Sequence, residues 1–277
     1  MIGRRLILAI QFLTRLPTPQ VRDFRQEDLS RSAVYYPLVG AIIGVLLALP
    51  LYGLSDRPWL AGVLTLLMWV WVTGALHLDG LGDVADAFGA AHRNPQRFLE
   101  VLKDPHMGVF GVVTLIMQLL LKFVLLTELA VGPLWFGIVL VPAWARWGTL
   151  WWSQRIPSLH GDGLGERFSW QLRPSAMWLW AALLAAISLV FAWPLLVTLL
   201  LVPLVALWWK RKLGGISGDG LGASVEVVET LLMLALVILA PLATGFAGVL
   251  LERRKPRSHS CIRSQVTRTI CAHCCAI

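Results

Sequence analysis

Long runs of apolar residues restrict the fold of this chain more than any other feature. A helix needs about 20 apolar residues to cross a bilayer, because lipid offers no hydrogen-bond partner to an open backbone. Pro241 and Gly245 interrupt the last of these runs, so whether it crosses fully stays open. The sequence predicts an all-α fold, a polytopic membrane helix bundle with about seven transmembrane helices, over residues 37–54, 59–76, 108–129, 134–152, 177–193, 194–209 and 230–251.

The composition supports this class of protein. Hydrophobic residues make up 57% of the 277 residues and charged residues only 14%, whereas soluble domains carry roughly 25% charged residues. The formal net charge is +8, and residues 252–277 contribute +5 of it, from six basic residues and one acid. Because the positive charge is mainly a property of this tail, it does not favour a nucleic-acid partner.

Lys and Arg residues gather in alternate connections between the predicted spans. They occupy the N-terminal segment, the loops 77–107 and 153–176, and the loop after the sixth span, whereas the intervening turns carry only Arg57. By the positive-inside rule, these long loops face the cytoplasm. Residues 4–19 are too short to span once Arg15 is excluded, so they predict an amphipathic helix at the membrane interface.

The tetrapeptide Asp-Gly-Leu-Gly occurs three times, at residues 79–82, 162–165 and 219–222. Each copy lies in one of the predicted cytoplasmic loops, beside a span. Glycine lets a backbone come close to a ligand, and aspartate supplies a hard oxygen ligand. Gly80 and Gly220 are therefore candidate substrate-binding residues.

The densest group of acids is the run HLDGLGDVADAF, where Asp79, Asp83 and Asp86 follow a spacing of four and three residues. On a helix this spacing places all three carboxylates on one face, where they repel one another. A divalent cation resolves this repulsion, and carboxylates without cysteine favour Mg²⁺ over zinc. Asp219 resembles a fourth metal ligand, from a second direction. The competing interpretation is a solvated acidic face beside the lipid headgroups.

Two cations, Lys122 and Arg146, lie inside predicted spans, where a charged side chain is costly and faces a polar interior. Beside an acidic metal site they indicate an anionic substrate, and a guanidinium suits a bidentate contact with phosphate. Arg146 could instead reach the membrane surface. Lys122 could pair with Gln118 or Glu128. For Glu226, Glu229 and Asp104, an ordinary surface role and a site role stay equally open.

The chain resembles the cobalamin synthase family (adenosylcobinamide-GDP ribazoletransferase). The combination of His-x-Asp-Gly-Leu-x-Asp-x-x-Asp with a late Gly-Asp-x-Leu-Gly-Ala is specific, and the resemblance runs in order from residue 1 to about residue 245. It is carried by FLTRLPTP (12–19), YYPLVGAIIG (35–44), GALHLDGLGDVADAF (74–88), KDPHMGVFG (103–111) and GGISGDGLGA (214–223).

This resemblance implies a bacterial cytoplasmic (inner) membrane enzyme of the last step of cobalamin assembly. Such enzymes join adenosylcobinamide-GDP to alpha-ribazole or its 5′-phosphate and release GMP, with Mg²⁺ as the metal. The metal and diphosphate site carries over to Asp79, Asp83 and Asp86, and Asp219 matches the late motif. Asp83 and Asp86 are the candidate catalytic residues, because either could accept the proton of the attacking hydroxyl. Lys122 and Arg146 also match family positions.

The sequence departs from the family pattern at Gly82 and Ala87, and Pro105-His106 stands where Ser-Arg is commoner. Membrane lipid is an expected partner, and an oligomer stays open. The alternative functions are a membrane transporter of an anionic substrate and another Mg-dependent membrane phosphotransferase.

Two parts of the chain are expected to differ. Residues 1–251 are interpreted as the integral membrane catalytic domain. Residues 252–277 hold all four cysteines, and we interpret them as a disordered or artefactual extension. A soft metal at the run CAHCC is the less favoured interpretation of this tail, because ligands so close in sequence crowd one another.

Overall fold

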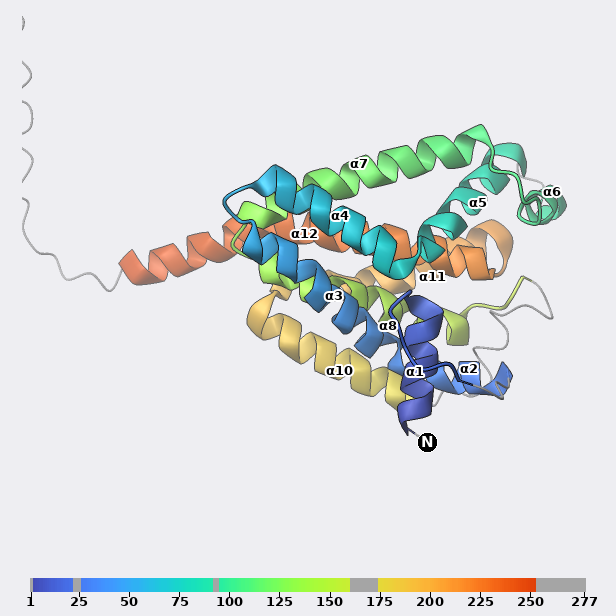
Figure 1. Ribbon diagram of the computed structural model, residues 1–277, viewed down its shortest axis with the longest axis horizontal. Helices are drawn as coiled ribbons and strands as arrows, with labels where there is room; N and C mark the ends of the chain where they lie inside the picture. The colour runs from blue at the N-terminus through green and yellow to red at the C-terminus, as the bar shows by residue number, and fades with distance from the viewer. Residues whose placement is uncertain (1, 22–25, 92–94, 160–173, 253–277) are drawn as a thin grey trace, which may run out of the picture. The chain divides into compact units, whose positions relative to one another are not determined.

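A computed structural model describes residues 2–21, 26–91, 95–159 and 174–252 (Figure 1). Met1–Ala240 forms one compact unit that carries the predicted site, and Pro241–Ile277 forms a second. The repeat at 162–165 and the tail from 253 onward lie outside the described residues.

The described residues are helical and hold no strand, which confirms the predicted all-α class. Three short 3-10 helices, η1 (Ala33–Tyr35), η2 (Trp135–Val139) and η3 (Trp193–Val197), join longer elements. The α-helices are α1 (Ile2–Leu13), α2 (Gln26–Ser32), α3 (Tyr36–Gly53), α4 (Pro58–Thr73), α5 (Leu76–Ala91), α6 (Pro95–Val101), α7 (Val109–Val131), α8 (Val141–Arg155), α10 (Pro174–Phe191), α11 (Thr198–Leu213) and α12 (Gly218–Glu252).

Several described helices are long and apolar enough to cross a membrane, so the chain is an integral membrane protein. Helices α4 and α5 meet at a bend of 88° and add a sixth span if they are counted together. The predicted number of seven is therefore not confirmed in the described part of the chain. The five single spans are Asp28–Gly53, Val109–Val131, Pro174–Phe191, Trp193–Leu213 and Gly218–Ala240.

The span predicted at 134–152 is one that the structure does not confirm. The segment is divided into η2 and α8, and the 15 residues of α8 reach only about 22 Å at the usual helical rise. Its large side chains Trp144, Trp147 and Trp152 are buried, and α8 packs against α3, α10 and α11. The apolar run here is explained by burial among other helices instead of by contact with lipid.

The other differences concern where helices begin and end. The break predicted near Pro194 is confirmed, because α10 ends at Phe191 and η3 follows. Helix α12 begins at Gly218, twelve residues before the predicted start at residue 230, and so includes Asp219 and two glutamates. Helix α1 (Ile2–Leu13) covers most of residues 4–19, which were predicted to form an amphipathic helix at the membrane interface.

Glycines allow two of the closest helix contacts. A Cβ atom at Gly40 or Gly44 of α3 would collide with the backbone at Pro142 or Val139, beside the start of α8. Small residues of this kind let membrane helices approach closely. The contact places α8 directly against α3, inside the bundle.

The bend between α4 and α5 has left-handed backbone at two consecutive residues, Gly74 (φ 62°) and Ala75 (φ 60°). Their amides donate to the last carbonyls of α4, at Trp71 and Val70, which is a usual way to end a helix. The bend turns α5 away from the direction of α4 and carries the acidic motif toward the start of α12.

Candidate active site

Helix α5 crosses the first turn of α12 in direct backbone contact. A Cβ atom added to Gly80 would lie 2.8 Å from the carbonyl oxygen of Asp219 and 3.0 Å from its Cα atom. No larger residue fits there without moving one helix. Gly80 therefore holds the aspartates of α5 beside Asp219, and its predicted contact with substrate stays a prediction.

Gly220 has a similar packing position one residue further along α12. A Cβ atom there would lie 2.9 Å from Cγ1 of Ile216 and 3.1 Å from the ring of Trp209. The residue is buried. Its predicted role in substrate binding also stays a prediction, and the structure shows it supporting the turn that precedes α12.

Three of the four predicted metal ligands gather where α5 meets α12. Asp79 is exposed, and Asp83 and Asp219 are half-buried. Asp83 lies close enough to Asp79 and Asp219 for the charges of both carboxylates to act on it. In the described part of the chain, no Lys or Arg pairs with Asp79 or Asp83. The cluster is thus rich in negative charge.

The carboxylates do not form a closed cage. Among the described residues, no three His, Cys, Asp or Glu side chains already stand close enough to hold one metal ion. Mg²⁺ in proteins is usually held by one or two carboxylates and completes its shell with water and substrate phosphates. The oxygen donors at this crossing fit that mode of binding, and they do not fit a preformed structural metal site.

Asp86 has a different environment from the other three acids. Its side chain is buried, and its two oxygens accept hydrogen bonds from the backbone amides of Gly108 (2.7 Å) and Gly111 (2.9 Å). These amides belong to the start of α7, where a negative charge is stabilising. The geometry makes Asp86 an anchor for α7, because both of its oxygens already accept hydrogen bonds and are poorly available to a metal or a substrate. Its predicted metal and catalytic roles stay predictions.

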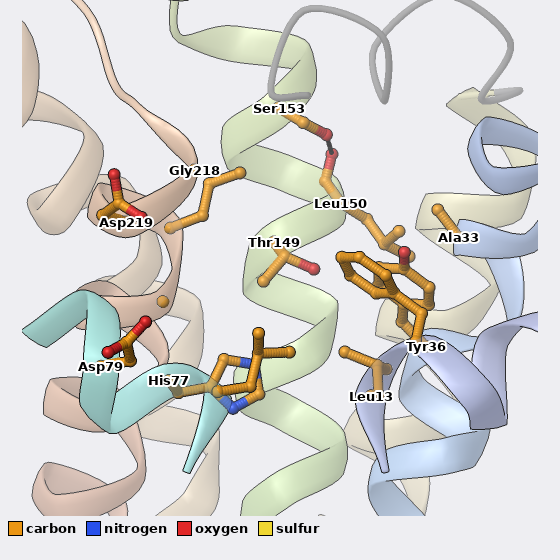
Figure 2. A pocket seen from close by; sticks show the side chains of 14 residues that line it. Leu13, Ala33, Tyr36, His77, Asp79, Thr149, Leu150, Ser153, Gly218 and Asp219 are labelled. Atoms are coloured by element: carbon orange, nitrogen blue, oxygen red, sulfur yellow. Dashed lines mark hydrogen bonds between the residues drawn. The ribbon is translucent and has the colours of Figure 1, made fainter. Parts of the chain in front are cut away.

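A pocket of about 200 Å³, which we call the apolar pocket, opens beside two of the acids. Asp79 and Asp219 lie on one side of it, and Leu13 and Tyr36 lie on the opposite side (Figure 2). The ring of Tyr36 stacks on Phe12, with the centroids 5.9 Å apart. The acids therefore face an aromatic and aliphatic wall across a small space.

Lys122 and Arg146, the predicted substrate-binding cations, are buried in a charge cluster away from solvent. The Nζ atom of Lys122 lies 2.6 Å from Glu226 and 2.8 Å from Glu229, and Arg146 contacts the second oxygen of Glu229. Two cations and two anions balance, as buried charges in a membrane require. Their role in binding substrate stays a prediction, and their observed partners are the two glutamates.

Gln118, one of the two alternative partners that the sequence offered for Lys122, instead joins the charge cluster through other groups. Its amide nitrogen lies 3.1 Å from Glu226 and 2.8 Å from the hydroxyl of Thr230. Lys122 also lies over the ring of Trp69, 4.2 Å from its centroid. The sequence left Glu226 and Glu229 undecided, although two cations inside spans imply two buried anions.

His77 connects this cluster to the apolar pocket. Its ring lines the pocket, and its Nδ1 atom lies 3.4 Å from a guanidinium nitrogen of Arg146. A guanidinium only donates hydrogen bonds, so Nδ1 accepts and the proton of the neutral ring is assigned to Nε2. The sequence gave little weight to this single histidine, and the signal available was its place two residues before Asp79.

Asp104 and His106, which the sequence left open, form an exposed turn before α7. The ring Nδ1 of His106 lies 2.7 Å from the carboxylate of Asp104, which also accepts from the backbone amide of His106 (3.0 Å). Both hydrogen bonds lower the pKa of Asp104, and the one with the ring of His106 has the larger effect. The geometry indicates a local turn.

The fold and the site together define a polytopic membrane protein with a carboxylate cluster at the edge of an apolar pocket. Residues 5–237 match the family described as cobalamin-5-phosphate synthase. The chain therefore belongs to the cobalamin-5-phosphate synthase family, and all the site residues described above lie within the match.

Curated relatives agree with this family. An adenosylcobinamide-GDP ribazoletransferase of Laribacter hongkongensis is 53% identical over 244 residues, which cover 85% of this chain and 97% of that protein. A protein of the same name from Thiobacillus denitrificans is 46% identical over 246 residues, covering 87% and 98%. No solved structure matches the chain.

Proposed function

We propose that the chain joins adenosylcobinamide-GDP to alpha-ribazole, or to its 5′-phosphate, and releases GMP. A ribose hydroxyl oxygen forms a bond to the phosphorus attached to cobinamide, and the bond from that phosphorus to the bridging oxygen breaks. GMP leaves with the bridging oxygen and its electron pair. The observation that carries this proposal is the convergence of Asp79, Asp83 and Asp219 beside a pocket, within the family match.

Mg²⁺ is part of the proposal. Asp79, Asp83 and Asp219 would hold it, because they crowd together and no described Lys or Arg neutralises Asp79 or Asp83. When bound, the ion supplies positive charge to the diphosphate of the substrate. This requirement suits phosphoryl transfer, in which the protein chiefly positions groups and stabilises charge.

The chain's own residues orient the reactants and receive the proton. Of the two predicted bases, Asp83 is favoured as the acceptor of the hydroxyl proton, because both oxygens of Asp86 are already hydrogen-bonded to α7. A candidate base needs an oxygen within reach of the hydroxyl. The stacked rings of Phe12 and Tyr36 give the apolar pocket an apolar wall against which a flat ring can pack.

The proposal places the protein in the bacterial cytoplasmic (inner) membrane with this site facing the cytoplasm. The positive residues in the loops on the side of the site support that orientation. Lipid is the partner of the helix faces, because α7 exposes large apolar side chains such as Ile116, Met117 and Leu120. Such a face is costly in water and favourable in hydrocarbon.

Transport of an anionic substrate is less well supported. A transport site lies near the middle of the membrane at broken helices. Here the deeply buried charges of Lys122, Arg146 and Glu229 are paired with one another. The relatives are also named as transferases.

The test is turnover by the purified full chain in lipid nanodiscs. Adenosylcobinamide-GDP and alpha-ribazole are supplied with and without Mg²⁺, and both GMP and the cobalamin product are measured. We expect product only with the metal and a loss of at least about 100-fold in Asp83→Asn, a size typical for removal of a group acting in the transition state. Asp56→Asn, in the exposed turn at the other end of α4, is the control. No product with any divalent cation rejects the proposal.

A further inference from the structure

A second pocket, which we call the polar pocket, adjoins the apolar one. The end of α1 and the residues after it line one side, with Gln11, Thr14 and Arg15. The bend between α4 and α5 lines the other side. Phe12, Leu76 and Asp79 line both pockets, so the two spaces meet at a single carboxylate.

Arg15 and Asp79 are both fixed to the same bend. The backbone amide of Arg15 donates to the carbonyl of Val72 (2.7 Å), and the amide of Asp79 donates to that of Ala75 (2.9 Å). The side chain of Arg15 passes directly over Gly74, where a Cβ atom would collide with it. The bend thus fixes where a cation and an anion enter the polar pocket.

The backbone of this bend is strained. Ala75 is the only residue other than glycine with a positive φ (60°) among the described residues. Such a conformation costs roughly 1–3 kcal/mol and persists where the surroundings impose it, often at binding sites. The hydrogen bonds that end α4 hold Ala75 in this conformation, so this part of the wall of the polar pocket is fixed.

The charge of Arg15 is available to a ligand. Its side chain is exposed, and no carboxylate in the described ranges pairs with it, although Asp79 lines the same pocket. A guanidinium presents several donors in one plane and matches the oxygens of a phosphate. The polar pocket therefore has the chemistry of a phosphate or nucleotide site.

We propose, on the basis of the proposed function, that the two pockets hold the two reactants. The apolar pocket receives the aromatic base of alpha-ribazole, and the polar pocket receives the GMP half of adenosylcobinamide-GDP with Arg15 on its phosphate. The ribose oxygen forms its bond to the cobinamide phosphorus beside Asp79. The bond to GMP breaks, its electron pair stays on the GMP oxygen, and the hydroxyl proton passes to a carboxylate of the cluster.

The reverse assignment is unfavourable for both ligands. A phosphate on the side of the apolar pocket away from Asp79 and Asp219 would lose its hydration against Leu13 and the stacked rings of Phe12 and Tyr36, and burying an unpaired charge is very costly. The benzimidazole ring of ribazole is flat and apolar and suits that wall. At about 200 Å³ the apolar pocket accepts such a base, while the much larger corrin ring stays outside.

The experiment separates the Michaelis constants of the two substrates. Wild type, Arg15→Gln and Arg15→Lys are assayed in nanodiscs, and the dissociation constant of GMP is measured by calorimetry without turnover. Arg15→Gln is expected to raise the KM for adenosylcobinamide-GDP and the Kd for GMP about tenfold, a typical value for a charge-assisted contact. The KM for alpha-ribazole should change less than twofold, and Arg15→Lys should recover part of the loss.

Two further variants complete the test. Arg57→Gln, in an exposed turn at the other end of α4, is the matched control and should leave all three constants unchanged. Leu13→Ala, in the apolar wall, should raise the KM for alpha-ribazole severalfold and leave GMP binding within twofold.

The outcomes also separate this inference from the proposed function. Absence of turnover in the wild type would reject the proposed function, whereas turnover with GMP affinity unchanged in Arg15→Gln would overturn only the division of the pockets. If Arg15→Gln alters only the dependence of activity on anionic lipid, Arg15 is a contact for phospholipid, and the inference is wrong. Equal increases of both Michaelis constants would also overturn it.

Discussion

At the scale of single residues, the charge cluster shows how a membrane interior tolerates ions. Lys122 and Glu229 are almost completely buried, and their charges are compensated within hydrogen-bond distance. Such a cluster contributes little net free energy when intact, but removing one member leaves an uncompensated charge. The cluster connects α7, α8 and α12 through four side chains.

We predict that Glu229→Gln lowers the free energy of unfolding by about 3–5 kcal/mol, because Arg146 and Lys122 then lose their shared anion. The measurement is the thermal midpoint of the purified protein in detergent. Glu100→Gln, which removes an exposed glutamate paired with Arg97, is the control and should change stability by less than 1 kcal/mol.

The double variant Lys122→Met with Glu226→Gln removes one charge of each sign and leaves the pair of Arg146 and Glu229. It is expected to be more stable than Lys122→Met alone, because the two sites share a partner and their effects do not add. Equal or lower stability of the double variant would contradict the view that charge balance holds the cluster.

At the scale of elements, Asp86 and Asp83 are predicted to separate in function. Asp86→Ala removes the acceptor of two amides at the start of α7 and should lower stability by about 1–3 kcal/mol per unsatisfied group. Asp83→Asn should leave the thermal midpoint nearly unchanged and lose turnover. Thermal midpoints and rates of GMP release measured on the same preparations check this. If Asp86→Ala is stable but inactive, Asp86 acts in the active site and the prediction is wrong.

The crossing of α5 and α12 gives a second prediction about elements. Gly80→Ala puts a methyl group against the backbone of Asp219, so the two helices must move apart. The carboxylates of Asp79 and Asp83 then shift relative to that of Asp219. Displacement of about 1 Å can cost roughly 100-fold in rate, and we expect kcat/KM to fall at least about tenfold. Gly53→Ala is the control, because a Cβ atom there meets nothing within 4 Å.

These elements also show what the sequence can and cannot predict. Apolar length and turn residues were sufficient for α3, α7, α10 and α11, because each is a long run that faces lipid on one side. The same hydrophobic signal was misleading for α8, since burial among helices and burial in lipid select the same residues.

The candidate site was predictable only in part. The spacing of Asp79 and Asp83 on one helix is local, so the sequence contained it. The contacts of Asp86 with Gly108 and of Gly80 with Asp219 join residues far apart in the chain, and no local pattern records them. Arg15 was treated as an interruption of an apolar run, although the structure places it in a pocket wall.

At the scale of the whole molecule, the chain consists of a part that matches the family and a tail that lies outside the match. The match ends at residue 237, and all four cysteines follow it. We predict that a chain ending at Glu252 keeps GMP release within twofold of the full chain, measured in nanodiscs at equal protein concentration. A large loss of activity would show that the tail takes part in the reaction.

The shortened chain has no cysteine and so permits a direct test of orientation. Ser55 lies in the exposed turn between α3 and α4, and Lys103 lies in the exposed segment before α7, at the end of the helices that carries the acids. Because the basic loops share the side of Lys103, a membrane-impermeant maleimide on intact cells should label Ser55→Cys. It should label Lys103→Cys only after permeabilisation. The opposite pattern would place the carboxylates outside the cytoplasm, where a substrate made inside the cell could not reach them without crossing the membrane.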